Sequence, residues 1–171
     1  NQPGSILEIG TGTGQHAVHF AGNMPHITWQ PSDQPENHQL CLPWLAEAGL
    51  ANIKKPLALD VNARNWQVPP VNGVFSANTA HIMSWQDVEA MFRGVSDKLH
   101  NGEAFCLYGP FNYNRQFTSP SNRQFDEYLR QRDSTMGIRD LDDLKKIGAE
   151  NGLDLEMDFE MPANNRLLVW R

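Results

Sequence analysis

Three glycines at alternate positions, Gly10, Gly12 and Gly14, are the residues whose spacing points most directly to chemistry. They follow a short apolar run at 6–9 that contains one acid, Glu8. Glycine adopts positive φ and carries no Cβ, so a ligand can lie against the main chain. The N–H groups at the start of the next helix would then face that ligand. The segment therefore predicts a nucleotide-type binding loop at the first strand-to-helix turn of an α/β sheet.

The glycine spacing separates two kinds of nucleotide-like ligand. A dinucleotide fingerprint reads G-x-G-x-x-G with an acid about 20 residues further on, and its third glycine, counted from Gly10, would fall on Gln15. The observed Glu-x-Gly-x-Gly-x-Gly pattern instead resembles the first motif of class I S-adenosylmethionine-dependent methyltransferases. S-adenosylmethionine carries a cationic sulfonium and no phosphate, so a carboxylate behind the loop suits it better than it suits pyrophosphate. The resemblance assigns to this cofactor Glu8, Gly10, Thr11, Gly12 and Gly14, with a ligand-free glycine turn as the alternative.

Acidic residues follow the second and third predicted strands. In an open parallel sheet, ligands bind beyond the carboxyl ends of the strands. Asp33 lies 23 positions after Gly10 and is the candidate acceptor for the ribose hydroxyls; the alternative is a turn carboxylate that caps the next helix. Asp60 is the candidate acceptor for the adenine amino group, with the Val61 backbone beside the ring, although aspartate is also a common turn residue.

The fourth and fifth strands end in residues suited to the reacting end of the cofactor. Asn78 leaves the sheet beside the expected methionine end, and His81 follows within a turn as a candidate general base. Tyr108 is a second candidate for catalysis and could also shape the substrate pocket. The alternative interpretations are a structural histidine and a tyrosine that ends a core strand with its hydroxyl in water.

Three further residues are candidates for substrate binding. His16 stands at the start of the first helix, and Asn164 and Asn165 lie in a turn expected on the same side of the sheet as the cofactor loop. Asparagine is also an ordinary turn residue. His16 and His19 are three apart, but no matching cluster of Cys, His or acids accompanies them, so we predict no metal site.

These residues require a sheet whose strands alternate with helices. The predicted strands are 6–9, 27–30, 57–59, 73–77 and 104–108, and the predicted helices begin near 15, 36, 84, 122 and 140. Ser84 with Asp87 resembles a capping box, and Ser121 with Gln124 is the candidate cap of the fourth helix. Residues 153–161 alternate between apolar and acidic, and 166–171 are apolar in the middle, which predicts an antiparallel hairpin.

This arrangement predicts an α/β, Rossmann-like fold in a single domain over residues 1–171. Five strand–helix units and a terminal hairpin resemble the seven-stranded class I methyltransferase sheet. That resemblance implies the strand order 3-2-1-4-5-7-6, with strand 7 antiparallel and helices on both faces.

The composition limits the partners. The net charge of -6 argues against a nucleic-acid partner, and no apolar stretch is long enough to span a membrane. Cys41 and Cys106 follow no metal or disulfide pattern, which favours a reducing, cytoplasmic setting. The sequence does not determine the oligomeric state.

The whole chain also resembles an uncharacterised family of methyltransferase-like proteins, catalogued as a domain of unknown function within the class I superfamily. The resemblance implies the fold and the cofactor class and leaves the substrate open. It also leads us to expect a helical segment before the first strand, which this sequence lacks. The motifs that carry it are Gly12–Ala17, Trp29–Asp33, Phe75–Asn78, Leu107–Phe111, Pro120–Asn122, Gly137–Asp140 and Met161–Asn165.

We therefore predict an S-adenosylmethionine-dependent methyltransferase that acts on a small-molecule acceptor. One alternative is a non-catalytic protein that binds S-adenosylmethionine or serves as an interaction module. The other is an NAD(P)-dependent oxidoreductase. Gln15 at the third fingerprint position and the antiparallel last strand count against the oxidoreductase.

Overall fold

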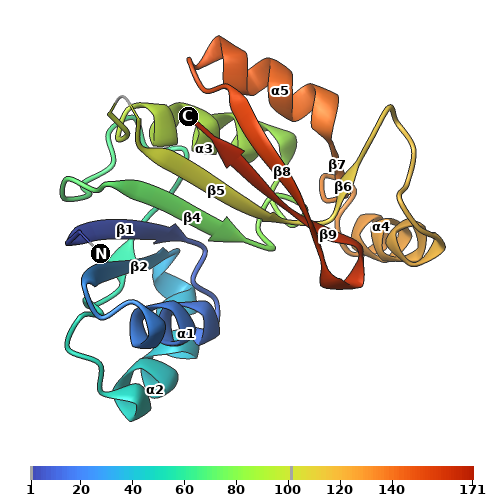
Figure 1. Cartoon of the computed structure of the whole chain (residues 1–171). Helices are drawn as coiled ribbons and strands as arrows, with labels where there is room; N and C mark the ends of the chain where they lie inside the picture. The colour runs from blue at the N-terminus through green and yellow to red at the C-terminus, as the bar shows by residue number, and fades with distance from the viewer. Residues whose placement is uncertain (1, 101) are drawn as a thin grey trace.

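The main feature of the molecule is a seven-stranded sheet in the order β3-β2-β1-β4-β5-β9-β8, as the computed structural model in Figure 1 shows for residues 2–100 and 102–171. Two further strands, β6 and β7, pair separately. The strands are β1 (Gly4–Ile9), β2 (Ile27–Asp33), β3 (Leu57–Ala58), β4 (Gly73–Ala77), β5 (Ala104–Gly109), β6 (Phe111–Asn112), β7 (Arg139–Asp140), β8 (Leu155–Met161) and β9 (Asn165–Trp170). The α-helices are α1 (Gln15–Asn23), α2 (His38–Ala48), α3 (Trp85–Ser96), α4 (Pro120–Arg132) and α5 (Leu141–Glu150).

The strand directions confirm the predicted topology. β1 pairs in parallel with both β2 and β4, and β4 pairs in parallel with β5. β9 is antiparallel to β5 and to β8, so β8 runs in the same direction as the first five strands. With β9 as the seventh strand and β8 as the sixth, the predicted order 3-2-1-4-5-7-6 is correct. The order reverses between β1 and β4, and this is where an open sheet of this kind forms a ligand crevice.

Helices cover the sheet on both sides, with α1 and α2 beside β1 and β2, and α3 and α5 on the other side (Figure 1). The side chains of β1 alternate between these layers. Leu7 and Ile9 join the large core with α3 and α5, whereas Ile6 packs with Trp29 and Ala17 against α1. Glu8 shares the α1 side with Ile6, and this alternation decides which layer buries its carboxyl group.

Several element boundaries differ from the sequence prediction. β2 continues to Asp33, because Ser32 and Asp33 pair with β3. A short 3₁₀ turn at Pro35–Asn37 precedes α2, which therefore begins at His38 and not near 36. The two-residue strands β6 and β7 were not predicted, since a run that short has no recognisable period.

The helix caps were predicted with mixed success. The capping box of Ser84 and Asp87 at α3 is confirmed, and Asp140 caps α5 as expected. The predicted cap of α4 is wrong: Ser119, and not Ser121, accepts the hydrogen bond from the Asn122 N–H. Pro120 explains the shift, because proline is well suited to the first helical position and so places the cap one residue before it.

Two helical glycines make opposite predictions for stability. A Cβ at Gly94 would lie 2.1 Å from Cζ2 of the buried Trp66, whereas a Cβ at Gly22 would meet only Leu50 Cδ1 at 3.7 Å. We expect Gly94→Ala to lower the free energy of unfolding by about 1–3 kcal/mol through overpacking. Gly22→Ala should raise it by roughly 0.5–1 kcal/mol, because alanine favours the helix. Urea unfolding of both variants tests this, and a stabilised Gly94→Ala would contradict the packing.

Candidate functional site

A cavity of about 520 Å³ opens at the carboxyl ends of β1 to β4, where the strand order reverses. The residues of the glycine loop form one side, the ends of β2 and β3 form the second, and the turn after β4 forms the third. The lining residues are Ile9, Gly10, Thr11, Gly12, Thr13, His16, Ser32, Asp33, Gln34, Asn37, Leu40, Leu59, Val61, Asn62, Ala77, Asn78, Thr79, Ile82, Met83 and Asp87.

The glycines of the loop have different structural tasks. All three have positive φ, at 74° for Gly10, 57° for Gly12 and 86° for Gly14. A Cβ at Gly10 would lie 2.3 Å from Cγ2 of Thr79, so this glycine lets the turn after β4 pack on the loop. A Cβ at Gly12 would meet nothing within 4 Å, and Gly12 lines the cavity. Gly14 does not line it; it precedes α1 and packs on Cys41 of α2.

The loop amides are bound by the protein itself. The N–H groups of Gly10 and Thr11 both donate to the carbonyl of Ser32, at 2.9 and 3.0 Å. The Gly12 N–H donates to Oδ2 of Asp33 at 2.9 Å. The Gly14 N–H donates to the Thr11 carbonyl at 3.0 Å. These four donors are therefore not directed at a ligand, contrary to the expectation for an anion-binding loop.

Glu8 lies beneath the loop and does not line the cavity. Its Oε2 accepts hydrogen bonds from Oγ1 of Thr11 at 3.0 Å and from Nε1 of Trp29 at 2.9 Å. Burial raises the pKa of Glu8 to about 7, although both hydrogen bonds act in the opposite direction. The predicted cofactor contact of Glu8 is therefore replaced by a supporting role, in which its carboxyl group holds Thr11 of the loop to Trp29 of β2.

Asp33 lines the cavity as the last residue of β2. Besides the Gly12 N–H, its carboxylate accepts the Gln34 N–H and Nδ2 of Asn37 on Oδ1, both at 2.8 Å. A carboxylate has about four lone-pair positions, so acceptor capacity is left for a ligand hydroxyl. The capping contact considered from the sequence and the position on the cavity are thus both present.

The loop after β3 places a different residue on the cavity from the one predicted. Val61 lines the cavity, as expected, but among the described lining residues its neighbour is Asn62 and not Asp60. Asp60 is exposed, and its Oδ1 accepts the Asn62 N–H at 2.9 Å. Nδ2 of Asn62 donates to Oδ1 of Asp87 at 2.7 Å. Sequence reasoning missed Asn62 because it follows a stronger candidate by two positions.

The turn after β4 forms the third side. Asn78 lines the cavity with a φ of 57°, a left-handed conformation that asparagine tolerates better than most residues. Thr79 anchors the turn, because its Oγ1 lies 2.5 Å from Oγ of Ser76. Ile82 and Met83 present apolar side chains to the cavity, and Ile82 is 47% exposed.

The two predicted catalytic residues lie outside the described lining of this cavity. His81 is buried beside Phe125, with ring centroids 5.1 Å apart. Burial, and then the charge of Arg139, lower the pKa of His81 to about 4. A Cβ at Gly109 would lie 3.7 Å from Nδ1 of His81 and 3.9 Å from Oδ1 of Asn78, so these side chains converge. Tyr108 is half-buried in β5.

Of the predicted substrate contacts, the structure places one on the cavity. His16 lines it, and burial lowers the pKa of this histidine. Asn164 packs against α4 instead: its carbonyl accepts Nδ2 of Asn122 at 3.2 Å, and its own Nδ2 donates to Oγ of Ser121. Nδ2 of Asn165 donates to the Pro162 carbonyl within the hairpin turn. The turn that holds these two asparagines lies at the same edge of the sheet as the glycine loop, because β8 is parallel to the first strands, but neither residue lines the described cavity. Their contact with a substrate stays a prediction.

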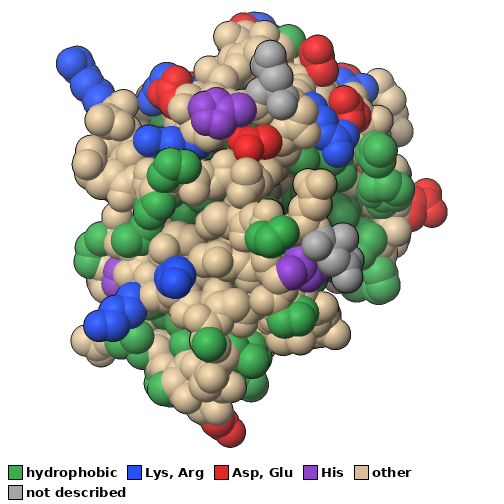
Figure 2. Space-filling model, turned by 60° about the vertical axis from the view of Figure 1, so that its left-hand side comes forward, with side chains coloured by type: hydrophobic (Ala, Val, Ile, Leu, Met, Phe, Trp, Pro, Cys, Tyr) green, Lys and Arg blue, Asp and Glu red, His purple; other side chains and the backbone are tan. Residues whose placement is uncertain are grey.

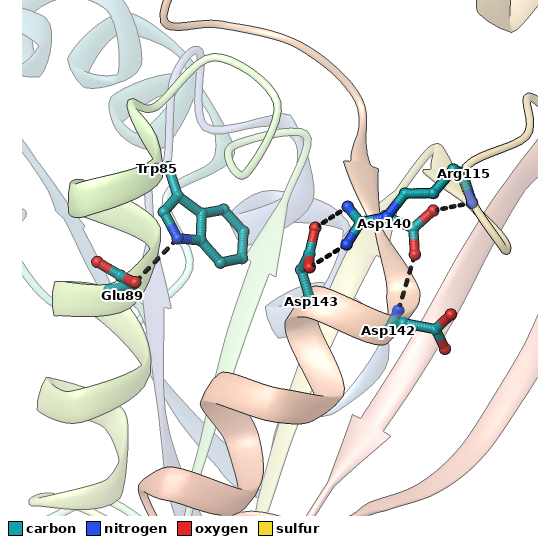
Figure 3. Close-up of polar contacts among 6 residues, drawn as sticks. All are labelled: Trp85, Glu89, Arg115, Asp140, Asp142 and Asp143. Carbon is teal, nitrogen blue, oxygen red and sulfur yellow. Dashed lines mark hydrogen bonds and ion pairs between the residues drawn. The ribbon is translucent and has the colours of Figure 1, made fainter.

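A second cavity, of about 490 Å³, lies between α3, α4 and α5, and several of the polar groups around it bind one another (Figure 3). Nε1 of Trp85 donates to Glu89 at 2.8 Å, and the guanidinium of Arg115 forms a two-fold ion pair with Asp143. Asp140 accepts the N–H groups of Arg115 and Asp142. These contacts join β7 and α5 to the loop after β6.

On the face in Figure 2, Lys and Arg side chains are interspersed with Asp and Glu. Within the described parts of the chain, no group of three or more His, Cys, Asp or Glu is placed to hold a metal ion. None of the helices formed by residues 2–100 and 102–171 has the length and apolarity to cross a membrane.

A family match covers the whole chain. Residues 1–171 match the family described as "Protein of unknown function (DUF938)". The chain belongs to the DUF938 family. The resemblance to an uncharacterised methyltransferase-like family is therefore confirmed at the level of the family.

Solved structures show the same fold at low sequence identity. An O-methyltransferase family protein from Burkholderia thailandensis has a TM-score of 0.86 at 12% identity, over 98% of this chain and 50% of its own. An O-methyltransferase family 2 protein from Planctomyces limnophilus, solved with apigenin, has a TM-score of 0.85 at 15% identity, with coverage of 99% and 50%. CalO1, a methyltransferase in calicheamicin biosynthesis solved with SAH, has a TM-score of 0.78 at 15% identity, with coverage of 98% and 48%. The DUF938 chain thus spans about half the length of these proteins and has a class I methyltransferase fold.

The raised pKa of Glu8 predicts a pH-dependent stability. Glu8 titrates at about 7 when folded and near 4.5 when unfolded, so the folded state holds an extra proton between these pH values. The free energy of unfolding should therefore fall as pH rises through this window. Glu8→Gln cannot ionise, yet its carbonyl can still accept from Thr11 and Trp29. The free energy of unfolding of Glu8→Gln, relative to that of the wild type, should therefore increase between pH 5 and pH 8. One pKa unit corresponds to about 1.4 kcal/mol, so the increase should reach up to about 3 kcal/mol.

Urea unfolding at several pH values measures this difference. Glu160→Gln, which removes a carboxyl group that is 89% exposed, is the matched control and should follow the wild-type profile. A constant difference between Glu8→Gln and the wild type from pH 5 to pH 8 would show that Glu8 is ionised in the folded protein.

Proposed function

We propose that this DUF938 protein is an S-adenosylmethionine-dependent methyltransferase that binds its cofactor in the cavity at the glycine loop. The observation that carries the proposal is the internal use of the loop amides. Gly10, Thr11, Gly12 and Gly14 all donate to protein oxygens. A loop that binds a phosphate must direct such donors at the ligand, whereas S-adenosylmethionine has no phosphate to receive them.

The same observation disfavours the oxidoreductase. A dinucleotide places its pyrophosphate at the start of the first helix, where the glycine loop supplies N–H groups. Here the Gly12 N–H faces the carboxylate of Asp33, which would repel a pyrophosphate at that position. The loop is therefore electrostatically suited to a ligand that brings hydroxyl donors and a positive charge.

The residues on the cavity fit S-adenosylmethionine group by group. Asp33 offers acceptor capacity to the ribose hydroxyls, and Val61 with Asn62 offers an apolar surface and an amide for the adenine. The missing side chain of Gly12 leaves room for the ligand against the main chain. Asn78 is assigned to the methionine end. When bound, S-adenosylmethionine supplies an electrophilic methyl group.

The protein's own contribution to methyl transfer is mainly to hold an acceptor in line with that methyl group. His81 is the candidate that would take a proton from the acceptor. Its pKa of about 4 keeps the imidazole neutral near pH 7, so a ring nitrogen can accept a hydrogen bond from the acceptor, but the same low pKa makes His81 a weak base. One of the similar solved proteins was crystallised with apigenin and another is a methyltransferase in calicheamicin biosynthesis, which supports a small organic acceptor.

A binding protein without catalytic activity is the second candidate. Its support is the position of His81 and Tyr108 outside the described lining of the cavity. Both functions share the same cofactor, so cofactor binding does not separate them. Transfer of a radiolabelled methyl group to a panel of small phenols, amines and carboxylates would favour the enzyme, whereas tight cofactor binding with no labelled product across the panel would favour the binding protein.

The free thiols of Cys41 and Cys106 suit a reducing compartment such as the cytoplasm.

Calorimetric titration with S-adenosylhomocysteine tests the cofactor assignment. Asp33→Ala removes both the ribose acceptor and the Gly12 contact, and a hydrogen bond to a charged group contributes about 1.5–3 kcal/mol. We therefore expect this variant to bind S-adenosylhomocysteine with a dissociation constant roughly 10 to 100 times larger than that of the wild type. Glu160→Ala, which removes a carboxylate that is 89% exposed and does not line the cavity, is the control and should bind like the wild type.

Two results would contradict the proposal. Binding of NAD by the wild type without binding of S-adenosylhomocysteine would restore the oxidoreductase. Unchanged affinity in Asp33→Ala would remove the ribose assignment while leaving the cofactor in place.

A further inference from the structure

The turn of residues 79–83, which forms the third side of the cavity, is held from outside by a distant segment. Its main chain bends sharply, with the N–H groups of Ile82 and Met83 both donating to the Thr79 carbonyl. The carbonyls of Ala80, His81 and Met83 point away from this turn. All three accept hydrogen bonds from residues 137–139.

Arg139 makes two of these three contacts. Its Nε donates to the Ala80 carbonyl at 2.9 Å, and its Nη2 donates to the carbonyls of Met83 and Thr135. The third contact comes from the Gly137 N–H, which donates to the His81 carbonyl at 2.9 Å. Arg139 is only 8% exposed. Among the described residues, no carboxylate lies within ion-pair distance of it.

A buried cation bonded to carbonyls calls for a structural explanation. Burying a charge without a counter-ion costs free energy unless hydrogen bonds compensate it. The planar guanidinium can donate in several fixed directions at once, which a lysine ammonium on a flexible stem does not reproduce. The guanidinium also lies over the Trp85 ring, 6.0 Å from its centroid, so the side chain has little freedom to leave the turn.

The inner side of the same turn is fixed by the glycine loop. Cγ2 of Thr79 lies 2.3 Å from the position that a Cβ at Gly10 would take, and Oγ1 of Thr79 forms a hydrogen bond with Oγ of Ser76. The turn is thus clamped between the loop on the cavity side and Arg139 on the opposite side. Ile82 and Met83, which line the cavity, lie at the end that Arg139 holds.

We infer that Arg139 is a positioning residue for the cofactor cavity: it fixes the turn of residues 79–83, and through it Ile82 and Met83, without touching the ligand. This inference rests on the proposed function, because it assumes that the ligand of the cavity is S-adenosylmethionine. It assigns an indirect effect on affinity to Arg139, a residue 106 positions after Asp33 in the chain.

The experiment compares Arg139→Ala and Arg139→Lys with Arg115→Ala as the matched control. Arg115 lines the same second cavity as Arg139, but its guanidinium pairs with Asp143 and not with the carbonyls of the turn. Titration with S-adenosylhomocysteine, well below the melting temperature of each variant, measures the affinity. Hydrogen exchange at the Ile82 and Met83 amides reports on the turn itself.

Both Arg139 variants should bind S-adenosylhomocysteine at least 10-fold more weakly than the wild type and exchange these two amides faster. Arg115→Ala should match the wild type in both measurements. Arg139 lines the 490 Å³ cavity, so a small guanidinium ion has access to its place. Methylguanidinium at tens of millimolar should therefore restore part of the affinity of Arg139→Ala, and methylammonium should not.

The outcomes separate this inference from the proposed function. Failure of the wild type to bind S-adenosylhomocysteine overturns the proposed function and this inference with it. Binding by the wild type together with equal affinity in Arg139→Lys overturns the inference alone. Weaker binding without faster exchange at the Ile82 and Met83 amides overturns it too, since the loss of affinity would then not pass through the turn. If Arg139→Ala does not fold, Arg139→Lys decides by the same two measurements.

Discussion

The structure depends first on how the end of β2 fastens the glycine loop. The Ser32 carbonyl accepts two successive amides of the loop, the Ser32 N–H bonds Oγ1 of Thr11, and the carboxylate of Asp33 accepts the next amide, that of Gly12. These contacts satisfy main-chain groups that a sharp turn would otherwise leave unpaired, and buried unpaired groups are costly. The loop is therefore preformed, and its shape requires no ligand. What it offers a ligand is space, an acid and a bare main chain.

A second consequence of this fastening is the burial of Glu8. Because β1 alternates, its acid faces the layer of Trp29 and α1, where Thr11 and the indole both donate to it. Burial of a carboxyl group favours the protonated form. The site therefore has two acids with different tasks. Asp33 lines the cavity, where a ligand can contact it. Glu8 lies beneath the glycine loop and joins Thr11 of the loop to Trp29 of the sheet.

The opposite side of the cavity is built on a different principle. The turn of residues 79–83 follows β4 directly and has no helix of its own to satisfy its carbonyls. Arg139 and Gly137, which lie more than fifty residues later in the chain, supply the donors. The small β6–β7 sheet brings this segment into place. The glycine loop is thus held by residues 21 positions later in the chain, whereas this turn is held by residues more than fifty positions later.

Most of the fold and about one side of the site could be predicted from the sequence. The period of the apolar residues indicated each large strand and helix, and the terminal hairpin followed from the short distance between 153–161 and 166–171. The spacing of Gly10, Gly12 and Gly14 located the cavity, and chain distance from Gly10 indicated Asp33. These features are local, because they depend on backbone freedom and on neighbours a few positions apart.

Only the tertiary structure decided which polar groups face the ligand and which support the fold. The sequence suggested Asp60 and Glu8 as ligand contacts. In the structure, Asp60 is exposed and accepts a hydrogen bond from the Asn62 N–H of its own turn, and Glu8 is buried because the side chains of β1 alternate between the two faces of the sheet. Asn164 and Asn165 turn to α4 and to their own hairpin, because the partners they find there lie far away in the chain or depend on the fold of the turn. Asn62 and Arg139 carry no motif at all. Their positions follow from long-range packing, which the order of residues along a single chain does not display.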